Sequence, residues 1–169
     1  MRKILRTIDA INDRVGSAAR WLCPALVLLI TMEVFRRFAF NSPSMWAFES
    51  SMMIGAVIYV FGWAYVERYR AHIRVDVFYN RLSRRLQALI DVLGNLLLFF
   101  PYIIVFTYQA GKWTQYAWAV NEKMQETGWY PPFGPLRTVL AIGMVLLLFQ
   151  GIANFIRDFY LLIRNKPYD

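Results

Sequence analysis

Three long runs of residues without a charged side chain constrain the fold more than any other feature of this 169-residue chain. They are Ser50–Val66, Val92–Gly111 and Thr138–Ile156, each bounded by charged residues. A helix rises about 1.5 Å per residue, so about 20 apolar residues cross a hydrocarbon core about 30 Å thick. Each run therefore predicts a transmembrane helix.

A weaker fourth span lies around Ala18–Phe38, where the uncharged centre Trp21–Met32 is followed by Glu33, Arg36 and Arg37. A tilted helix whose charged side chains reach toward the interface accommodates such a segment. Hydrophobic residues make up 58% of the chain and charged residues 18%, against roughly 45–50% and about 25% in soluble domains. We therefore predict an all-α membrane protein with four transmembrane helices. They form one domain over residues 1–169, with spans at about 18–38, 48–67, 90–111 and 136–160.

Lysine and arginine residues set the expected orientation, because cytoplasmic loops are enriched in them. With both termini inside, fourteen of the 19 lysines and arginines fall on the inner side and five on the outer side. Six of the fourteen lie in the loop after the second span, where anionic inner-leaflet lipids would attract them, so no nucleic-acid partner is needed. We expect both termini in the cytoplasm and the loop at 112–135 on the opposite side of the membrane.

Two segments beside the spans are amphipathic and predict helices that lie on the inner surface of the membrane. The first covers about residues 3–15, and the second about residues 79–88. The open alternative is that each segment continues a span past the membrane. In the first segment, the apolar stripe consists of Ile4, Ile8, Ile11 and Val15. The charged residues expected to point away from this stripe are Arg2, Arg6, Asp9 and Asp13. In the second segment, the apolar stripe consists of Leu82, Leu86, Leu89 and Ile90. The opposite face carries Arg81, Arg84 and Arg85, and we expect these three arginines to be interfacial anchors.

The chain shows no recognisable catalytic or metal-binding pattern. It has one histidine, and no GxSxG, HExxH or P-loop motif occurs, so we expect no catalytic residue, cofactor or metal. The last two uncharged runs hold amides and hydroxyls that suit hydrogen bonds between helices, and no charged residue that would mark a transport path. These side chains are Asn95, Thr107, Gln109, Thr138, Gln150 and Asn154. The pattern favours a subunit whose partner performs the transport.

Residues near the start of the second span are candidates for subunit contacts. Ser44, after Pro43, is expected to cap the helix, with Glu49 in its first turn, where a carboxylate suits the helix dipole. The alternative for Glu49 is a salt bridge to a partner subunit. Arg36 and Arg37 fit either interfacial anchors or subunit contacts.

Two further segments lie between the spans. His72, Arg74 and Asp76, in the sequence HIRVD, fit either a local turn or a contact site. The outer loop begins with KWTQYAWAVNEKMQ, which is compatible with a helix. It ends with GWYPPFGP, whose prolines and glycines exclude a regular helix.

The order of three motifs resembles the small membrane subunit of tripartite ATP-independent periplasmic (TRAP) transporters, the DctQ-like family. That family has an Arg-aromatic end to its first helix, a Pro-x-x-Trp-x-x-Glu entry to the second and a His-x-x-Val-Asp motif after it. EVFRRFAFNSPSMWAFESS and HIRVDVFYNRL contain these motifs, and the resemblance covers about residues 33–82. The matching residues are Arg36 or Arg37 with Phe38, then Pro43, Trp46 and Glu49, then His72, Val75 and Asp76.

The resemblance implies a partner and a role. Small subunits of this family pack beside a large membrane subunit that carries the substrate and sodium sites and moves as an elevator. A periplasmic binding protein delivers an organic acid such as a dicarboxylate or a sialic acid. The small subunit is then a scaffold without a substrate site, anchored in the lipid of the bacterial inner membrane and placed to help the binding protein dock. The resemblance thereby implies that the loop at 112–135 is periplasmic.

Two functions from other classes remain open at the level of sequence. One is a membrane-anchored enzyme or redox subunit with His72 as a ligand, although the chain offers no second histidine. The other is a small transporter that self-associates. A tightly bound absorbing cofactor would favour the first, and cross-linking to copies of this chain alone would favour the second.

Overall fold

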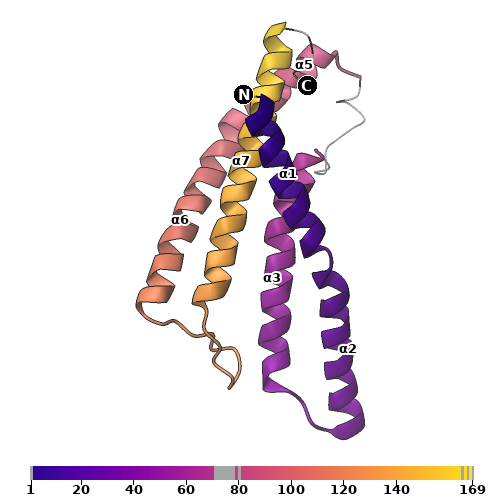
Figure 1. The fold of residues 1–169 in the computed structure, drawn as a ribbon, viewed down its shortest axis with the longest axis vertical. Coiled ribbons are helices and arrows are strands. Elements are labelled where there is room, and N and C mark those ends of the chain that lie inside the picture. The colour runs from indigo at the N-terminus through magenta and orange to yellow at the C-terminus, as the bar shows by residue number, and fades with distance from the viewer. Residues whose placement is uncertain (1, 71–78, 80, 165, 167, 169) are drawn as a thin grey trace.

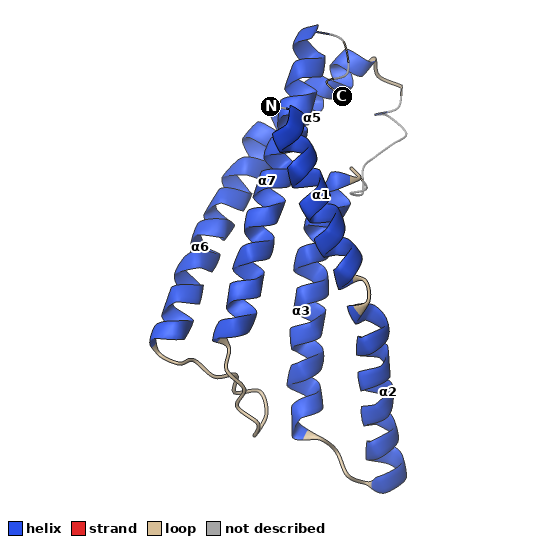
Figure 2. Ribbon diagram, in the orientation of Figure 1, coloured by secondary structure: helices blue, strands red, loops and turns tan. Residues whose placement is uncertain are grey.

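The computed structural model describes residues 2–70, 79, 81–164, 166 and 168. These residues form helices joined by turns and loops, with no strand among them (Figure 2). Four helical stretches are long and apolar enough to cross a membrane, which confirms the predicted number. The helices are α1 (Arg2–Ala19), α2 (Leu22–Phe40), α3 (Met45–Arg68), α5 (Arg84–Gly94), the π-helical turn η1 (Asn95–Phe99), α6 (Phe100–Ala119) and α7 (Gly134–Arg164).

The long helices form a row, in the order α6, α7, α3, α2 (Figure 1). Helix α7 packs against both α3 and α6, while α2 packs mainly against α3 and buries none of its residues. Helices α3 and α6 make at most a marginal contact with each other. The face of α7 between them is therefore left open.

The described ends of the chain lie at the same end of the molecule, which we call the terminal end (Figure 1). The guanidinium of Arg2 lies 5.5 Å from the ring centre of Tyr168 there. The opposite end, called the loop end, carries the turn between α2 and α3 and the loop between α6 and α7. Helix α1 crosses α3 and α7 near the terminal end.

The surface of the chain is strongly apolar, and its core is small. Ala64, Ile103 and Leu147 form the buried cluster between α3, α6 and α7. Leu28 on α2 is 70% exposed and Leu98 on η1 is 75% exposed. A contiguous exposed apolar surface marks contact with a membrane or another protein rather than with water, as four spanning helices require.

Pro101 explains the irregular turn between α5 and α6. Proline has no N–H to donate to the residue four positions earlier, and its ring crowds that carbonyl. The helix responds with a single π-helical turn, in which the N–H of Phe100 donates to the carbonyl of Asn95. The stretch Arg84–Ala119 thereby remains one helix of 36 residues.

Helix α1 packs against the other helices through one face and exposes part of its isoleucine stripe. Leu5, Asn12, Gly16 and Ala19 are its buried residues, whereas Ile4 and Ile11 of the stripe are 63% and 44% exposed. Gly16 permits a close approach to α3, because a Cβ at this position would collide with the ring of Tyr65. One leucine therefore packs inward together with small and polar residues, while Ile4 and Ile11 face outward.

The loop between α6 and α7 is folded back on itself. The N–H of Met124 donates to the Pro131 carbonyl at 2.9 Å, and the N–H of Phe133 donates to the Glu122 carbonyl at 2.8 Å. Helix α6 runs to Ala119, so the first part of KWTQYAWAVNEKMQ is helical. Helix α7 begins at Gly134, within GWYPPFGP. Pro135 is tolerated there, because the first backbone N–H groups of a helix have no partner within the helix and proline lacks only that group.

Candidate assembly site

A polar network joins α1, α3 and α7 toward the terminal end, and Gln150 of α7 is its fully buried centre. The Gln150 amide nitrogen donates to the Asp9 carboxylate at 3.0 Å, and its oxygen accepts from the Asn12 amide at 2.7 Å. One turn further along α7, the Asn154 amide donates to the backbone and side-chain oxygens of Glu67 at 2.8 and 2.9 Å. These bonds fasten α1 and the end of α3 to α7.

Guanidinium groups complete the network around the α1 carboxylates. Arg157 donates to Asp9 at 2.6 Å, and Arg68 lies 3.6 Å from the carboxylates of both Asp9 and Asp13. The Tyr69 hydroxyl donates to Asp13 at 2.6 Å, and this bond raises the pKa of Tyr69 above its ordinary value. The charged face of α1, predicted to point away from the isoleucine stripe, thus provides two carboxylates that bind groups on α7 and at the end of α3.

A second set of polar contacts ties α5 to α7 at the same end. Arg70 follows α3 and lies 2.6 Å from the carboxylate of Asp158, which is 4% exposed. Arg70 also lies 3.9 Å from the Asp91 carboxylate on α5, and the Tyr79 hydroxyl donates to Asp91 at 2.6 Å. The chain after α3, helix α5 and helix α7 are thus linked through two carboxylates.

At the loop end, Glu49 connects α3 to the α6–α7 loop. Its side chain is fully buried, and Oε1 accepts a hydrogen bond from the backbone N–H of Thr127 at 2.9 Å. The other oxygen, Oε2, is buried without a hydrogen-bond partner among the described residues. Glu49 lies beyond the first turn of α3, so the prediction of a residue that serves the helix dipole there is wrong.

Glu33 has the corresponding role for the α2–α3 turn. Its carboxylate accepts from the backbone N–H of Ser44 at 3.0 Å and lies 3.5 Å from Arg37. Ser44 is the N-cap residue of α3, but its side chain makes no capping bond, and its hydroxyl oxygen is buried without a partner in the described part of the chain. The predicted side-chain cap is therefore wrong, and Glu33 binds the N-cap residue instead.

Arg137 anchors the α6–α7 loop to both helices that it joins. Its guanidinium donates to the Glu122 carboxylate at 2.7 Å and to the Trp113 carbonyl at 3.3 Å. The ring of Phe133 lies 4.7 Å below the same guanidinium. The loop therefore has fixed attachments to α3, α6 and α7.

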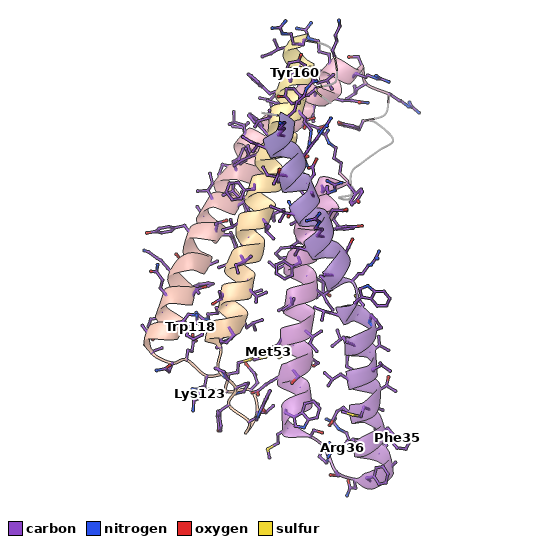
Figure 3. The ribbon with its side chains drawn as sticks, viewed as in Figure 1. Phe35, Arg36, Met53, Trp118, Lys123 and Tyr160 are labelled. Atoms are coloured by element: carbon purple, nitrogen blue, oxygen red, sulfur yellow. The ribbon has the colours of Figure 1, made fainter. Side chains whose placement is uncertain are left out.

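The remaining predicted site residues fall in three places. Arg36 is half-buried near the end of α2, Arg37 is exposed beside it, and Trp46 is 37% exposed in the first turn of α3. Figure 3 shows Phe35, Arg36, Trp118 and Lys123 at the loop end and Tyr160 at the terminal end. Arg81, Arg84 and Arg85 are exposed. His72, Arg74 and Asp76 lie outside the described residues.

A long groove runs between α3 and α6, with α7 as its floor. Its central part has a volume of about 740 Å³ and is lined mainly by apolar side chains of the three helices. A second hollow of about 350 Å³ shares Trp63, Phe106 and Met144 with it and reaches Glu67. A third of about 500 Å³ shares Gln109, Trp113 and Arg137 with the central part and reaches Lys112. The groove thus follows α7 from Arg137 to Leu147.

The comparison with protein families matches residues 26–160 to the tripartite ATP-independent periplasmic transporters, DctQ component. The chain belongs to the DctQ family. The match includes α3, α5, α6 and nearly all of α2 and α7, which confirms the resemblance inferred from the three motifs. No curated protein sequence matches the chain.

Membership of the DctQ family assigns the chain to a transporter rather than to an enzyme. A DctQ protein is the small membrane component of a tripartite system, alongside a large membrane subunit and a periplasmic binding protein. The described residues contain no group of three His, Cys, Asp or Glu side chains arranged to hold a metal ion. The contact residues that sequence reasoning missed include Asp9, Asn12 and Glu33. The helical spacing of Asn12, Gly16 and Ala19 was the available signal for the packed face of α1.

Proposed function

We propose that this DctQ protein is a non-catalytic scaffold subunit of a sodium-coupled TRAP transporter that imports an organic acid. The observation that carries the proposal is the distribution of buried polar residues. Among the described residues, Asn12, Gln150, Asn154 and Asp158 belong to the terminal-end contacts and Glu49 to the loop end. In the described part of the chain, no charged or amide side chain is buried between these two groups, so a path for an ion or an acid would have to lie in the partner subunit.

The proposal places both termini in the cytoplasm, with α1 and α5 braced against the inner surface. Exposed Arg81, Arg84 and Arg85 support it, because they would face anionic lipid headgroups. The exposed isoleucines Ile4 and Ile11 on α1 would face acyl chains. The terminal-end network would then hold α1 to the spanning helices.

The loop end would face the periplasm and receive the binding protein. Trp129 and Tyr130 at the tip of the α6–α7 loop are 47% and 53% exposed. The loop behind them is closed by backbone hydrogen bonds and held by Glu49 and Arg137. A fixed loop with exposed aromatic side chains suits a protein-docking surface.

The candidate contact residues keep their proposed role in assembly. Arg36, Arg37 and Trp46 belong to the loop-end part of this proposal, and His72, Arg74 and Asp76 to the segment after α3. Glu49 is buried within this chain, so it would act on assembly through the α6–α7 loop that it holds. Replacing Glu49 or Asp76 by alanine is expected to weaken assembly with the large subunit more than folding of this chain. Equal co-purification of the large subunit with wild type and both variants would contradict this assignment.

Reconstitution tests the proposed function. The purified chain, the large subunit and the binding protein are incorporated in all combinations, and sodium-driven uptake of labelled dicarboxylates and sialic acid is measured. The expected result is uptake only when the large subunit and the binding protein are present, with this chain raising the rate. Uptake by vesicles that contain this chain alone would contradict a scaffold role.

A further inference from the structure

The groove along α7 carries hydrogen-bond donors in the middle of the predicted spans. The Tyr59 hydroxyl and the Trp63 indole lie within the uncharged run of α3, and the Tyr102 hydroxyl lies within that of α6. These side chains are 69%, 45% and 62% exposed. No group in the described part of the chain accepts a hydrogen bond from any of them.

Acyl chains would leave these donors unsatisfied. The hydrocarbon core supplies no acceptor, and a polar group without a partner there costs substantial free energy. Aromatic side chains with a polar atom normally lie at the headgroup level, where water and lipid headgroups satisfy them. The Tyr59 and Tyr102 hydroxyls at mid-span, with the Trp63 indole three residues from the end of its uncharged run, therefore call for an occupant that offers acceptors.

The loop end of the groove adds a positive charge. Lys112 lines it and lies 4.6 Å above the Tyr108 ring, with no ion pair among the described residues. The neighbouring cation, Arg137, already binds Glu122. Lys112 is exposed and offers an occupant a charge that a carboxylate or the carbonyl end of a helix would complement.

Small residues leave room for a close approach. Ala56 of α3 and Ala110 of α6 line the central part of the groove. Gly55 and Gly62 flank Tyr59 by one helical turn on either side, and a Cβ at these positions would meet nothing within 4 Å. Small residues are the ones that let helices approach closely within a membrane.

We propose that this groove receives one transmembrane helix of the large membrane subunit. Its side-chain or carbonyl oxygens accept from Tyr59, Trp63 and Tyr102, and its acidic residue or C-terminal end meets Lys112. The inference rests on the proposed function and names the surface that it uses. Helix α2 provides the contrast, since its exposed Val27, Leu28 and Ile30 carry only hydrocarbon and suit acyl chains.

Site-specific photocross-linking in the native complex tests the assignment. Benzoylphenylalanine replaces Tyr59 or Ala110 in the groove, and Leu28 on α2 as the matched control, and adducts are identified by mass spectrometry. The expected result is an adduct with the large subunit from both groove positions and none from Leu28. Adducts from the groove with lipid alone, or with a second copy of this chain, would overturn the proposal, as would a large-subunit adduct from Leu28 alone.

Substitutions that fill the groove give an independent measure. Ala56→Trp and Ala110→Trp are expected to lower the amount of large subunit that co-purifies with this chain about tenfold, because each would overpack the contact. Leu28→Trp is expected to leave this amount unchanged. Tyr59→Phe, which removes only the hydroxyl and preserves the fold, is expected to lower it about threefold. If wild type recovers no large subunit, the proposed function fails. If wild type recovers it and all groove variants do so equally, only the groove assignment fails.

Discussion

Asp9 and Asp158 at the terminal end have different main partners from Glu33 and Glu49 at the loop end. At the terminal end, Asp9 and Asp158 meet guanidinium groups at 2.6 Å, and the contacts join helices that are distant in sequence. At the loop end, Glu33 and Glu49 accept from backbone N–H groups of connecting segments, at 3.0 and 2.9 Å. One end therefore fastens helices to each other, and the other fixes the course of the loops.

This difference predicts different consequences of mutation. Loss of a terminal-end residue should reduce the stability of the whole chain, because α1, α3 and α7 share one network. Loss of a loop-end residue should alter one loop and leave the helices in place. The following substitutions examine this contrast.

The largest effect is expected from Gln150→Leu. The change removes the buried amide that binds Asp9 and Asn12, and Asn12, only 1% exposed, loses its acceptor. We expect a loss of about 3 kcal/mol in the free energy of unfolding, measured in detergent by denaturant titration. Gln109→Leu, the same change at an exposed position in α6, is the control. Equal stability of the two variants would contradict a central role for Gln150.

Asp9→Asn is expected to be the next most destabilising change. The change leaves Arg157 and Arg68 without their shared carboxylate. The Asp9 side chain is 19% exposed, and this partial exposure reduces the expected loss of stability. We expect a loss of about 1–2 kcal/mol by the same titration. Asp13→Asn, at a site with 40% exposure, should cost less than about 1 kcal/mol. The reverse order would show that Asp13, not Asp9, fastens α1.

Glu49→Ala should act locally. It removes the acceptor of the Thr127 N–H, so amide exchange in residues 120–133 should become faster while the α1–α3–α7 contacts keep their protection. Hydrogen exchange with mass spectrometry measures both regions in one experiment. Glu33→Ala is the matched control and should affect only the turn at 41–44. Faster exchange throughout α7 in the Glu49 variant would remove the distinction between the two ends.

The smallest effect is expected from Arg37→Ala. Arg37 lies 3.5 Å from Glu33, but its side chain is 60% exposed. An exposed ion pair is worth under about 1 kcal/mol, so the unfolding free energy should change by less than about 0.5 kcal/mol. A larger loss would mean that the Glu33 contact with Ser44 depends on Arg37.

The sequence predicted the four spanning helices and some of their contacts for a physical reason. A run such as Val92–Gly111 has few alternatives in a bilayer, where the backbone must satisfy its own hydrogen bonds. The same reasoning predicted that Gln150 and Asn154 bind neighbouring helices, and the structure confirms it. Polar side chains in apolar runs need partners, and other helices are the available source.

The error over Glu49 arose because its contact joins distant parts of the chain. Glu49 looked like a local capping residue because its partner, Thr127, is 78 positions away. The packed face of α1 could not be predicted for a related reason. The isoleucine stripe predicted only a surface turned toward lipid, whereas the partners of Asn12 and Gly16 lie on α7 and α3, far along the chain.

The most direct test of the central claim is the composition of the complex that contains this chain. The chain is tagged after Asp169, expressed from its native operon, extracted in mild detergent and analysed by quantitative mass spectrometry. The account predicts one copy of a large, many-span membrane subunit for each copy of this chain. Recovery of this chain alone, or only with further copies of itself, would contradict its assignment as a scaffold subunit.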